Sequence, residues 1–159
     1  IHGVDISKPA VRMAARAFPA AKFSVASAFD VPLADNSVDA VFSVFAPTQA
    51  GELARLLRPG GHFLDVSPGP MHLWGLRELL YDDPVPHQRE FQALSQLDKV
   101  EQERVDFTLE LTGGQLQDLV AMTPYAYSGQ RENKAKITDS GLMTLGVSFL
   151  LSLYRLPPA

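Results

Sequence analysis

Nearly half of the 159 residues are apolar and 20% are charged, which suits one folded domain and excludes a disordered chain. The absence of cysteine excludes disulfides and thiolate metal sites within these residues, and the four histidines show no ligand spacing. A formal net charge of -4 argues against a large phosphate-binding surface. No apolar run is long enough to span a membrane, so we expect no membrane segment and a cytoplasmic protein.

The first predicted elements are a strand over residues 1–5 and a helix that ends near residue 18. Ser7 is a favourable N-cap residue for this helix, and Pro9 is suited to its first turn. Apolar residues spaced for one buried helix face follow: Val11, Ala14, Ala15 and Phe18.

A short strand over residues 22–26 and a loop over residues 31–37 come next. Residues 38–45 form an almost continuous apolar run, which is typical of a parallel strand covered on both faces. Pro47 can begin the next helix, which ends at the Arg-Pro-Gly-Gly of residues 58–61. Its inward residues are predicted to be Leu53, Leu56 and Leu57.

The second half begins with a strand over residues 62–67 and a helix over residues 71–81, and a short helix over residues 91–97 is a weaker prediction. Residues 104–111 alternate between apolar and polar, which indicates a half-exposed strand of antiparallel type. A helix over residues 115–122 and a strand over residues 144–154 complete the chain. This order predicts an α/β fold with a mainly parallel sheet and an antiparallel pair at one edge.

The segment GVDIS, residues 3–7, places the acid Asp5 at the end of a buried-type strand and before a helix. In nucleotide-binding α/β folds an acid at this position hydrogen-bonds ribose hydroxyls, and a glycine-rich turn lies about 20 residues before it. Only four residues precede Asp5 here. We therefore expect an N-terminally truncated chain, in which residues 1–159 are the C-terminal part of one domain.

Two further segments accompany the first: SAFDVPLADNSVD at residues 27–39 and ELARLLRPGG at residues 52–61. In this order and spacing the three segments resemble the class I S-adenosylmethionine-dependent methyltransferases. The resemblance implies a Rossmann-like fold, methyltransferase activity and S-adenosylmethionine as the cofactor.

A narrower resemblance rests on FAP at residues 45–47, SPGPMHL at residues 67–73 and MTPYA at residues 122–126. These segments are similar to the bacterial 23S rRNA guanine-N1 methyltransferases, which include the tylosin-resistance type. The resemblance implies methyl transfer to guanine N1 in 23S rRNA, with antibiotic resistance as an associated function. It also implies a zinc-binding module and a glycine-rich motif, both absent from these residues, with RNA contacts made through that module.

Two other functions stay open at this point. A small-molecule methyltransferase of the same fold is favoured by the acidic net charge. A methyltransferase-like domain that binds without turnover is the third alternative, and without the glycine-rich loop this stretch of chain alone is expected to be inactive. Self-association is also left open.

The resemblance implies the following cofactor-binding residues: Asp5, Ile6, Ser27, Ala28, Phe29, Phe45, Ala46 and His72. Many relatives carry an acid that reads the adenine amino group where this chain has Ser27. Core packing is the alternative reading of Ile6, Phe29 and Phe45, and a structural role is the alternative for His72. For Asp5 the alternative is an acid that only complements the dipole of the helix that follows it.

Deprotonation of guanine N1 needs a base or a water path. Asp30 and Asp65 are the candidates for this base, and neither is assigned as a catalytic residue. Trp74 is read as buried in its helix, with stacking on a base as the alternative. The basic residues are spread along the chain apart from Arg131, Lys134 and Lys136, which form a cluster near a loop. A solvated face is the default reading, and contact with an RNA backbone is the alternative.

Overall fold

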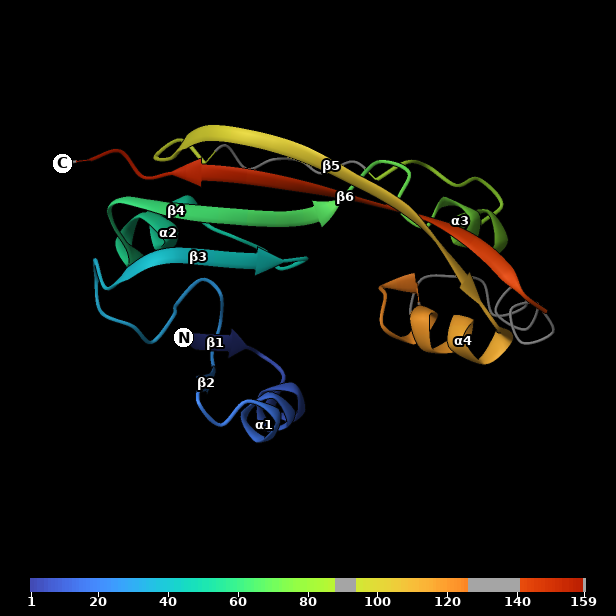
Figure 1. Ribbon diagram of the computed structural model, residues 1–159, viewed down its shortest axis with the longest axis horizontal. Helices are drawn as coiled ribbons and strands as arrows, with labels where there is room; N and C mark the ends of the chain where they lie inside the picture. The colour runs from blue at the N-terminus through green and yellow to red at the C-terminus, as the bar shows by residue number, and fades with distance from the viewer. Residues whose placement is uncertain (88–93, 126–140, 159) are drawn as a thin grey trace. The chain divides into compact units, whose positions relative to one another are not determined.

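The computed structural model describes residues 1–87, 94–125 and 141–158. Its elements follow the predicted order: β1 (His2–Asp5), α1 (Lys8–Ala17), β2 (Lys22–Val25), β3 (Val38–Val44), α2 (Ala50–Leu56), β4 (Leu57–Pro68), α3 (Trp74–Leu80), β5 (Asp98–Leu111), α4 (Gly113–Ala121) and β6 (Met143–Arg155). Strands β1 and β2 form a parallel pair, and the other four strands form a sheet in the order β3-β4-β6-β5 (Figure 1). Strands β3 and β4 are parallel, whereas β6 and β5 make the antiparallel edge. The predicted α/β fold is therefore confirmed.

The chain divides into two compact units, and strands β5 and β6 contribute residues to both. The described part of the first unit comprises residues 1–66, 94–102 and 151–158. That of the second comprises residues 67–87, 103–125 and 141–150.

The core of the first unit lies between α2, β4 and β6. Its buried residues are Leu53, Leu57, Phe63, Leu97 and Tyr154. The rings of Phe63 and Tyr154 stack with their centroids 5.8 Å apart. Leu56 is buried as well, so the three leucines predicted to point inward are all buried, although the helix ends at Leu56 and Leu57 begins β4.

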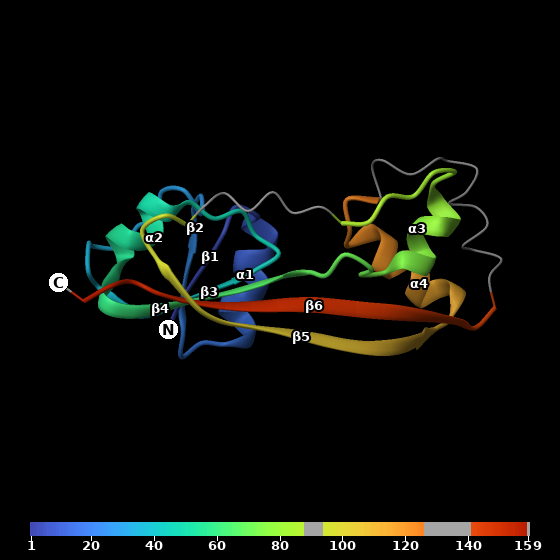
Figure 2. The same cartoon turned by 90° about the horizontal axis from the view of Figure 1, so that it is seen from above.

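The core of the second unit is built by α3 and α4, which lie next to each other in Figures 1 and 2, and by β6. Its buried residues are Leu73, Leu76, Leu80, Leu116, Val120, Tyr125, Leu145 and Val147. Leu109 and Leu111 of β5 pack against this cluster, whereas Val105 and Phe107, predicted to share their face, are exposed. A capping box between Thr112 and Gln115 begins α4.

Two predictions of burial in the first unit are wrong. Helix α1 has no buried residue, and Phe18 is exposed beside it. On β3 only Ser43 is buried, whereas Phe42 and Val44 are 72% and 61% exposed. The apolar pattern indicates which faces of α1 and β3 favour burial. Among the described residues, however, none covers these two faces.

Several predicted boundaries also shift. Helix α2 begins at Ala50 and not at Pro47, and α3 begins at Trp74 and not near residue 71. Residues 94–97 form a turn, and the remainder of the short helix predicted over residues 91–97 lies outside the described residues. In the part of the chain that the structure describes, no helix is both long and apolar enough to cross a membrane.

Candidate functional site

The carboxyl end of β1 presents Asp5 to solvent. Its Oδ1 atom accepts a hydrogen bond of 2.7 Å from the backbone N–H of Ser7, and the Ser7 hydroxyl in turn caps α1 by accepting from Ala10. These bonds fix the carboxylate at the start of a helix and leave its second oxygen available for a ligand. Ile6 is 79% exposed, so it is not the core residue that one reading of the sequence allowed.

The turn after β2 carries Ser27, Ala28 and Phe29. The Ser27 hydroxyl oxygen accepts the backbone N–H of Phe29 at 3.1 Å, and the Ser27 carbonyl accepts that of Asp30 at 3.2 Å. The Ser27 O–H remains able to donate to a ligand. Phe29 is half exposed, which excludes the alternative that it is a core residue of the first unit.

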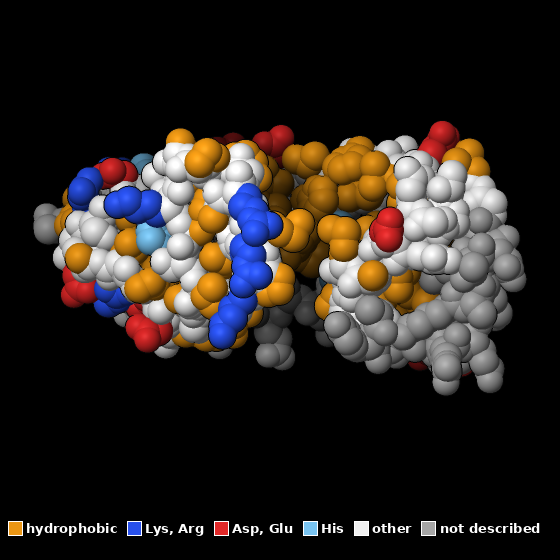
Figure 3. All heavy atoms as spheres, turned by 90° about the horizontal axis from the view of Figure 1, so that it is seen from below, with side chains coloured by type: hydrophobic (Ala, Val, Ile, Leu, Met, Phe, Trp, Pro, Cys, Tyr) orange, Lys and Arg blue, Asp and Glu red, His pale blue; other side chains and the backbone are white. Residues whose placement is uncertain are grey.

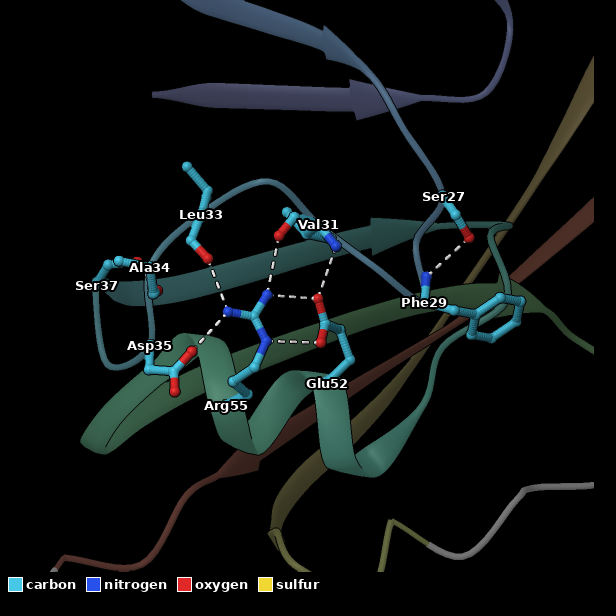
Figure 4. Close-up of polar contacts among 9 residues, drawn as sticks. All are labelled: Ser27, Phe29, Val31, Leu33, Ala34, Asp35, Ser37, Glu52 and Arg55. Atoms are coloured by element: carbon cyan, nitrogen blue, oxygen red, sulfur yellow. Dashed lines mark hydrogen bonds and ion pairs between the residues drawn. The ribbon is translucent and has the colours of Figure 1, made fainter.

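A clamp formed by Glu52 and Arg55 of α2 holds the loop that follows this turn (Figure 4). Glu52 accepts the backbone N–H of Val31 at 2.7 Å. Arg55 donates to the carbonyls of Val31 and Leu33 at 2.9 and 2.7 Å and to Asp35 at 2.8 Å. The clamp fixes the path of the chain immediately after Phe29.

Arg55 also binds both carboxylate oxygens of Glu52, at 2.7 and 2.8 Å. This bond lowers the pKa of Glu52 below its usual range, and burial of the carboxyl opposes the shift only in part. Glu52 and Asp35 in turn raise the pKa of Arg55. The clamp is therefore fully charged at neutral pH, and it joins the second and third sequence segments in the fold.

The carboxyl end of β3 turns sharply at Phe45, whose φ is 52°. A left-handed backbone is strained for a residue other than glycine and often marks a functional position. The Phe45 N–H donates to the Val66 carbonyl at 2.9 Å, while 51% of the residue stays exposed. Ala46 follows it, half-buried, with its carbonyl 3.4 Å from the Ser43 hydroxyl. Phe45 therefore presents an apolar ring at the end of a parallel strand, where open α/β sheets bind ligands.

His72 belongs to the second unit. Its Nδ1 atom lies 2.8 Å from the Ser148 carbonyl, and its ring packs against Phe149. Burial lowers the pKa of His72 below its usual value, so the ring is neutral at pH 7. Gly69 allows this arrangement, because a Cβ there would collide with the Ser148 hydroxyl and lie 3.0 Å from the Ser148 Cβ.

A second histidine, His87, lies beside His72, and no pattern in the sequence indicated a role for it. The two ring centroids are 6.0 Å apart, and the Tyr125 hydroxyl is 3.0 Å from Nε2 of His87. Burial, followed by the positive charge of Arg77, lowers the pKa of His87. The neutral ring can then accept the tyrosine O–H, which ties residue 87 to the end of α4.

The structure thus brings seven of the eight predicted site residues into the first unit and places His72 in the second. Sequence reasoning missed Glu52 and Arg55, although their spacing of three on a helix is typical of an ion pair.

Of the candidate bases, Asp30 is exposed and Asp65 is buried on β4. Trp74 is partly buried at the start of α3. Arg131, Lys134 and Lys136 lie outside the described residues.

Residues 1–65, which contain the ends of β1, β2 and β3, match the family model described as a methyltransferase domain. The chain is also 39% identical over 138 residues to the 23S rRNA (guanine(748)-N(1))-methyltransferase of Streptomyces fradiae. By both comparisons the chain is similar in sequence to methyltransferases.

A second relative, from Micromonospora griseorubida, is 38% identical to this chain over 129 residues and is named for guanine-N1 methylation of 23S rRNA. The two alignments cover 84% and 78% of this chain but 49% and 44% of the relatives. The chain thus spans about half the length of these curated relatives.

Solved structures share the fold of this chain. The YcgJ protein of Bacillus subtilis matches 99% of the chain with a TM-score of 0.62 at 16% identity, and the match covers 82% of that protein. A SAM-dependent methyltransferase of Methanosarcina mazei also matches 99% of the chain, with a TM-score of 0.56 at 16% identity and 82% of its own length covered. At these identities the likeness supports the architecture alone.

Proposed function

We propose that the protein transfers a methyl group from S-adenosylmethionine to guanine N1 of 23S rRNA. The observation that carries this proposal is the 39% identity, over 84% of the chain, with a relative named for that reaction. The small-molecule alternative has only the acidic net charge in its favour, and neither curated relative is named for a small substrate.

The first unit offers the kinds of chemical group that would bind an adenosine: a carboxylate, apolar side chains and hydrogen-bonding groups. Asp5 offers an exposed carboxylate oxygen to ribose hydroxyls, and Ile6 offers an exposed apolar surface for one face of the adenine. Ser27 and the backbone of Ala28 can hydrogen-bond the adenine edge, and Phe29 can cover the ring. Where many relatives carry an acid, the neutral Ser27 would hydrogen-bond the adenine without placing a negative charge beside it.

The rest of the donor site is proposed as follows. Phe45 and Ala46 line the donor at the end of β3, and the strained backbone of Phe45 holds its ring exposed there. His72 is proposed as a further donor contact from its place in the SPGPMHL segment. Its imidazole is neutral, and its Nδ1 atom lies 2.8 Å from the Ser148 carbonyl.

S-adenosylmethionine supplies an activated methyl group on a sulfonium, whose departure as a neutral thioether requires no acid. The protein's task is therefore to orient the guanine in line with that methyl, and orientation can supply about 7–11 kcal/mol of barrier reduction. N1 is paired in double-stranded RNA, so the substrate guanine is proposed to be splayed out of an RNA loop. The group that accepts the N1 proton is not assigned.

We also propose that residues 1–159 are the C-terminal part of a single methyltransferase domain in a longer protein. The coverage of about half of the relatives supports this. Strand β1 pairs only with β2, and β3 is at the end of its sheet, so among the described strands each has one unpaired edge. The exposed Phe42 and Val44 on β3 are suited to cover by further chain. The zinc module, through which most rRNA contacts are proposed, would lie in that part.

Deletion of the gene tests the proposed reaction. N1-methylguanine blocks Watson–Crick pairing, so reverse transcription of wild-type 23S rRNA should stop one nucleotide before the modified base. We expect the deletion to remove one such stop and a plasmid copy to restore it. An unchanged stop pattern would reject the rRNA substrate. Loss of the stop together with gained macrolide sensitivity would support the resistance function, and a cytoplasmic location follows from the proposed substrate.

A further inference from the structure

Helix α1 carries an aligned row of basic residues. Lys8, Arg12 and Arg16 are four residues apart, and four residues advance the helix by slightly more than one turn and by about 6 Å. All three residues are exposed. Figure 3 shows a continuous band of basic side chains along this helix, and we call these three residues the α1 basic face.

The three side chains of the α1 basic face form no ion pair with any acidic side chain in the described part of the chain. Arg55, Arg58 and Arg104 form ion pairs with acidic residues, whereas no described acidic side chain pairs with Lys8, Arg12 or Arg16. The helix itself contains no acidic residue. Adjacent like charges at this spacing repel, so the row weakens the helix rather than stabilising it.

The position of Lys8 adds to this cost. It is the first residue of α1, where the partial positive charge of the helix N-terminus disfavours a cation. Arg16 lies in the last turn of α1, where the helix dipole favours a cation, so folding stability accounts for Arg16 but not for Lys8 or for the alignment of the row. An anionic partner outside the described residues would account for both.

We propose that the α1 basic face binds the phosphate backbone of the RNA substrate. The proposal rests on the proposed function and extends it to a surface of this chain. Arginine suits this partner because its planar guanidinium can bind two phosphate oxygens at once. The net charge of -4 led to the opposite expectation, because a total charge does not report how the cations are arranged.

The test compares two variants with equal changes in charge. The first is Lys8→Gln/Arg12→Gln/Arg16→Gln. The second replaces three exposed basic residues elsewhere, Arg58→Gln/Lys99→Gln/Arg104→Gln. Both are made in the full-length protein, and the binding of a 23S rRNA transcript is measured at several salt concentrations.

We expect the α1 variant to bind the transcript at least tenfold more weakly at low salt. The slope of log affinity against log salt should become shallower by about 2–3, since each lost phosphate contact contributes about 0.7–0.9. The control variant should keep the wild-type slope. Glutamine removes repulsion within α1 and favours helix, so the melting temperature of the α1 variant should not fall.

Equal slopes for the wild type and the α1 variant would overturn the proposal, as would an equal loss in both variants. A loss of binding to phosphatidylserine vesicles with unchanged RNA affinity would assign the face to a lipid surface and also overturn it. The affinity for the transcript is measured separately from methylation of the RNA, so the two proposals can fail independently. A wild type that binds the transcript through α1 but methylates no guanine would refute the proposed function alone, and normal methylation with an unchanged slope would refute the α1 contact alone.

Discussion

Substitution of Asp5 by Asn tests the donor site with almost no change of shape. The amide oxygen of Asn can keep the 2.7 Å bond from the Ser7 N–H, so the start of α1 should be unaffected. The NH₂ group, however, replaces the carboxylate oxygen that is proposed to accept a ribose hydroxyl. Loss of one charge-assisted hydrogen bond costs about 1.5–3 kcal/mol. The dissociation constant for S-adenosylmethionine should therefore rise roughly 10- to 100-fold.

Isothermal titration of the full-length protein with S-adenosylmethionine measures this constant. Asp39→Asn is the matched control, because Asp39 is an exposed carboxylate on β3 that pairs only with the surface residue Arg58 among the described residues. The control should bind the donor as the wild type does. A wild-type dissociation constant for Asp5→Asn would remove Asp5 from the site and refute the reasoning.

Three further predictions concern the scaffold. Gly69→Ala should lower the free energy of unfolding by about 1–3 kcal/mol, because its new Cβ would push against Ser148, and thermal melting measures this. Arg55→Gln should release the loop after Phe29, so hydrogen exchange of residues 31–37 should accelerate and donor affinity should fall. The stability of the second unit should decrease as the pH falls below about 6.5, because the lowered pKa of His87 means that the unfolded state binds the proton first.

Each of these predictions has its own control. Gly146→Ala lies on the same strand as Ser148 with nothing within 4 Å of the new Cβ, so it should melt near the wild type. Arg58→Gln should leave the loop exchange unchanged, and equal exchange in the Arg55 variant would contradict the clamp. For the pH effect, His87→Gln should flatten the stability curve below pH 6.5. An unaltered curve would show that another group, such as the similarly buried His72, dominates.

The order of the elements was predictable because each leaves a local pattern in the sequence. The Ser7 cap, the inward leucines of α2 and the alternation of β5 all depend on neighbours within a few residues. Burial was less predictable, because it depends on which other surface arrives. Residues 38–45 are as apolar as a central strand, yet the described chain leaves Phe42 and Val44 exposed.

In the candidate site, too, features that depend on neighbouring residues were predictable, whereas contacts between distant residues were not. Asp5, Ile6 and Phe29 were chosen from short segments, and the structure presents all three to solvent at the ends of β1 and β2. The bond between Tyr125 and His87 joins residues 38 positions apart and left no sequence signal. The clamp of Glu52 and Arg55 explains a motif that sequence reasoning recognised only by resemblance.

The central claim is that the protein methylates N1 of a guanine in 23S rRNA. The most direct measurement incubates the purified full-length protein with labelled S-adenosylmethionine and 23S rRNA from the deletion strain, and then maps the labelled nucleoside by mass spectrometry. We predict one labelled N1-methylguanine at a single position. Label on another atom or base, or no label in the RNA, would contradict the claim.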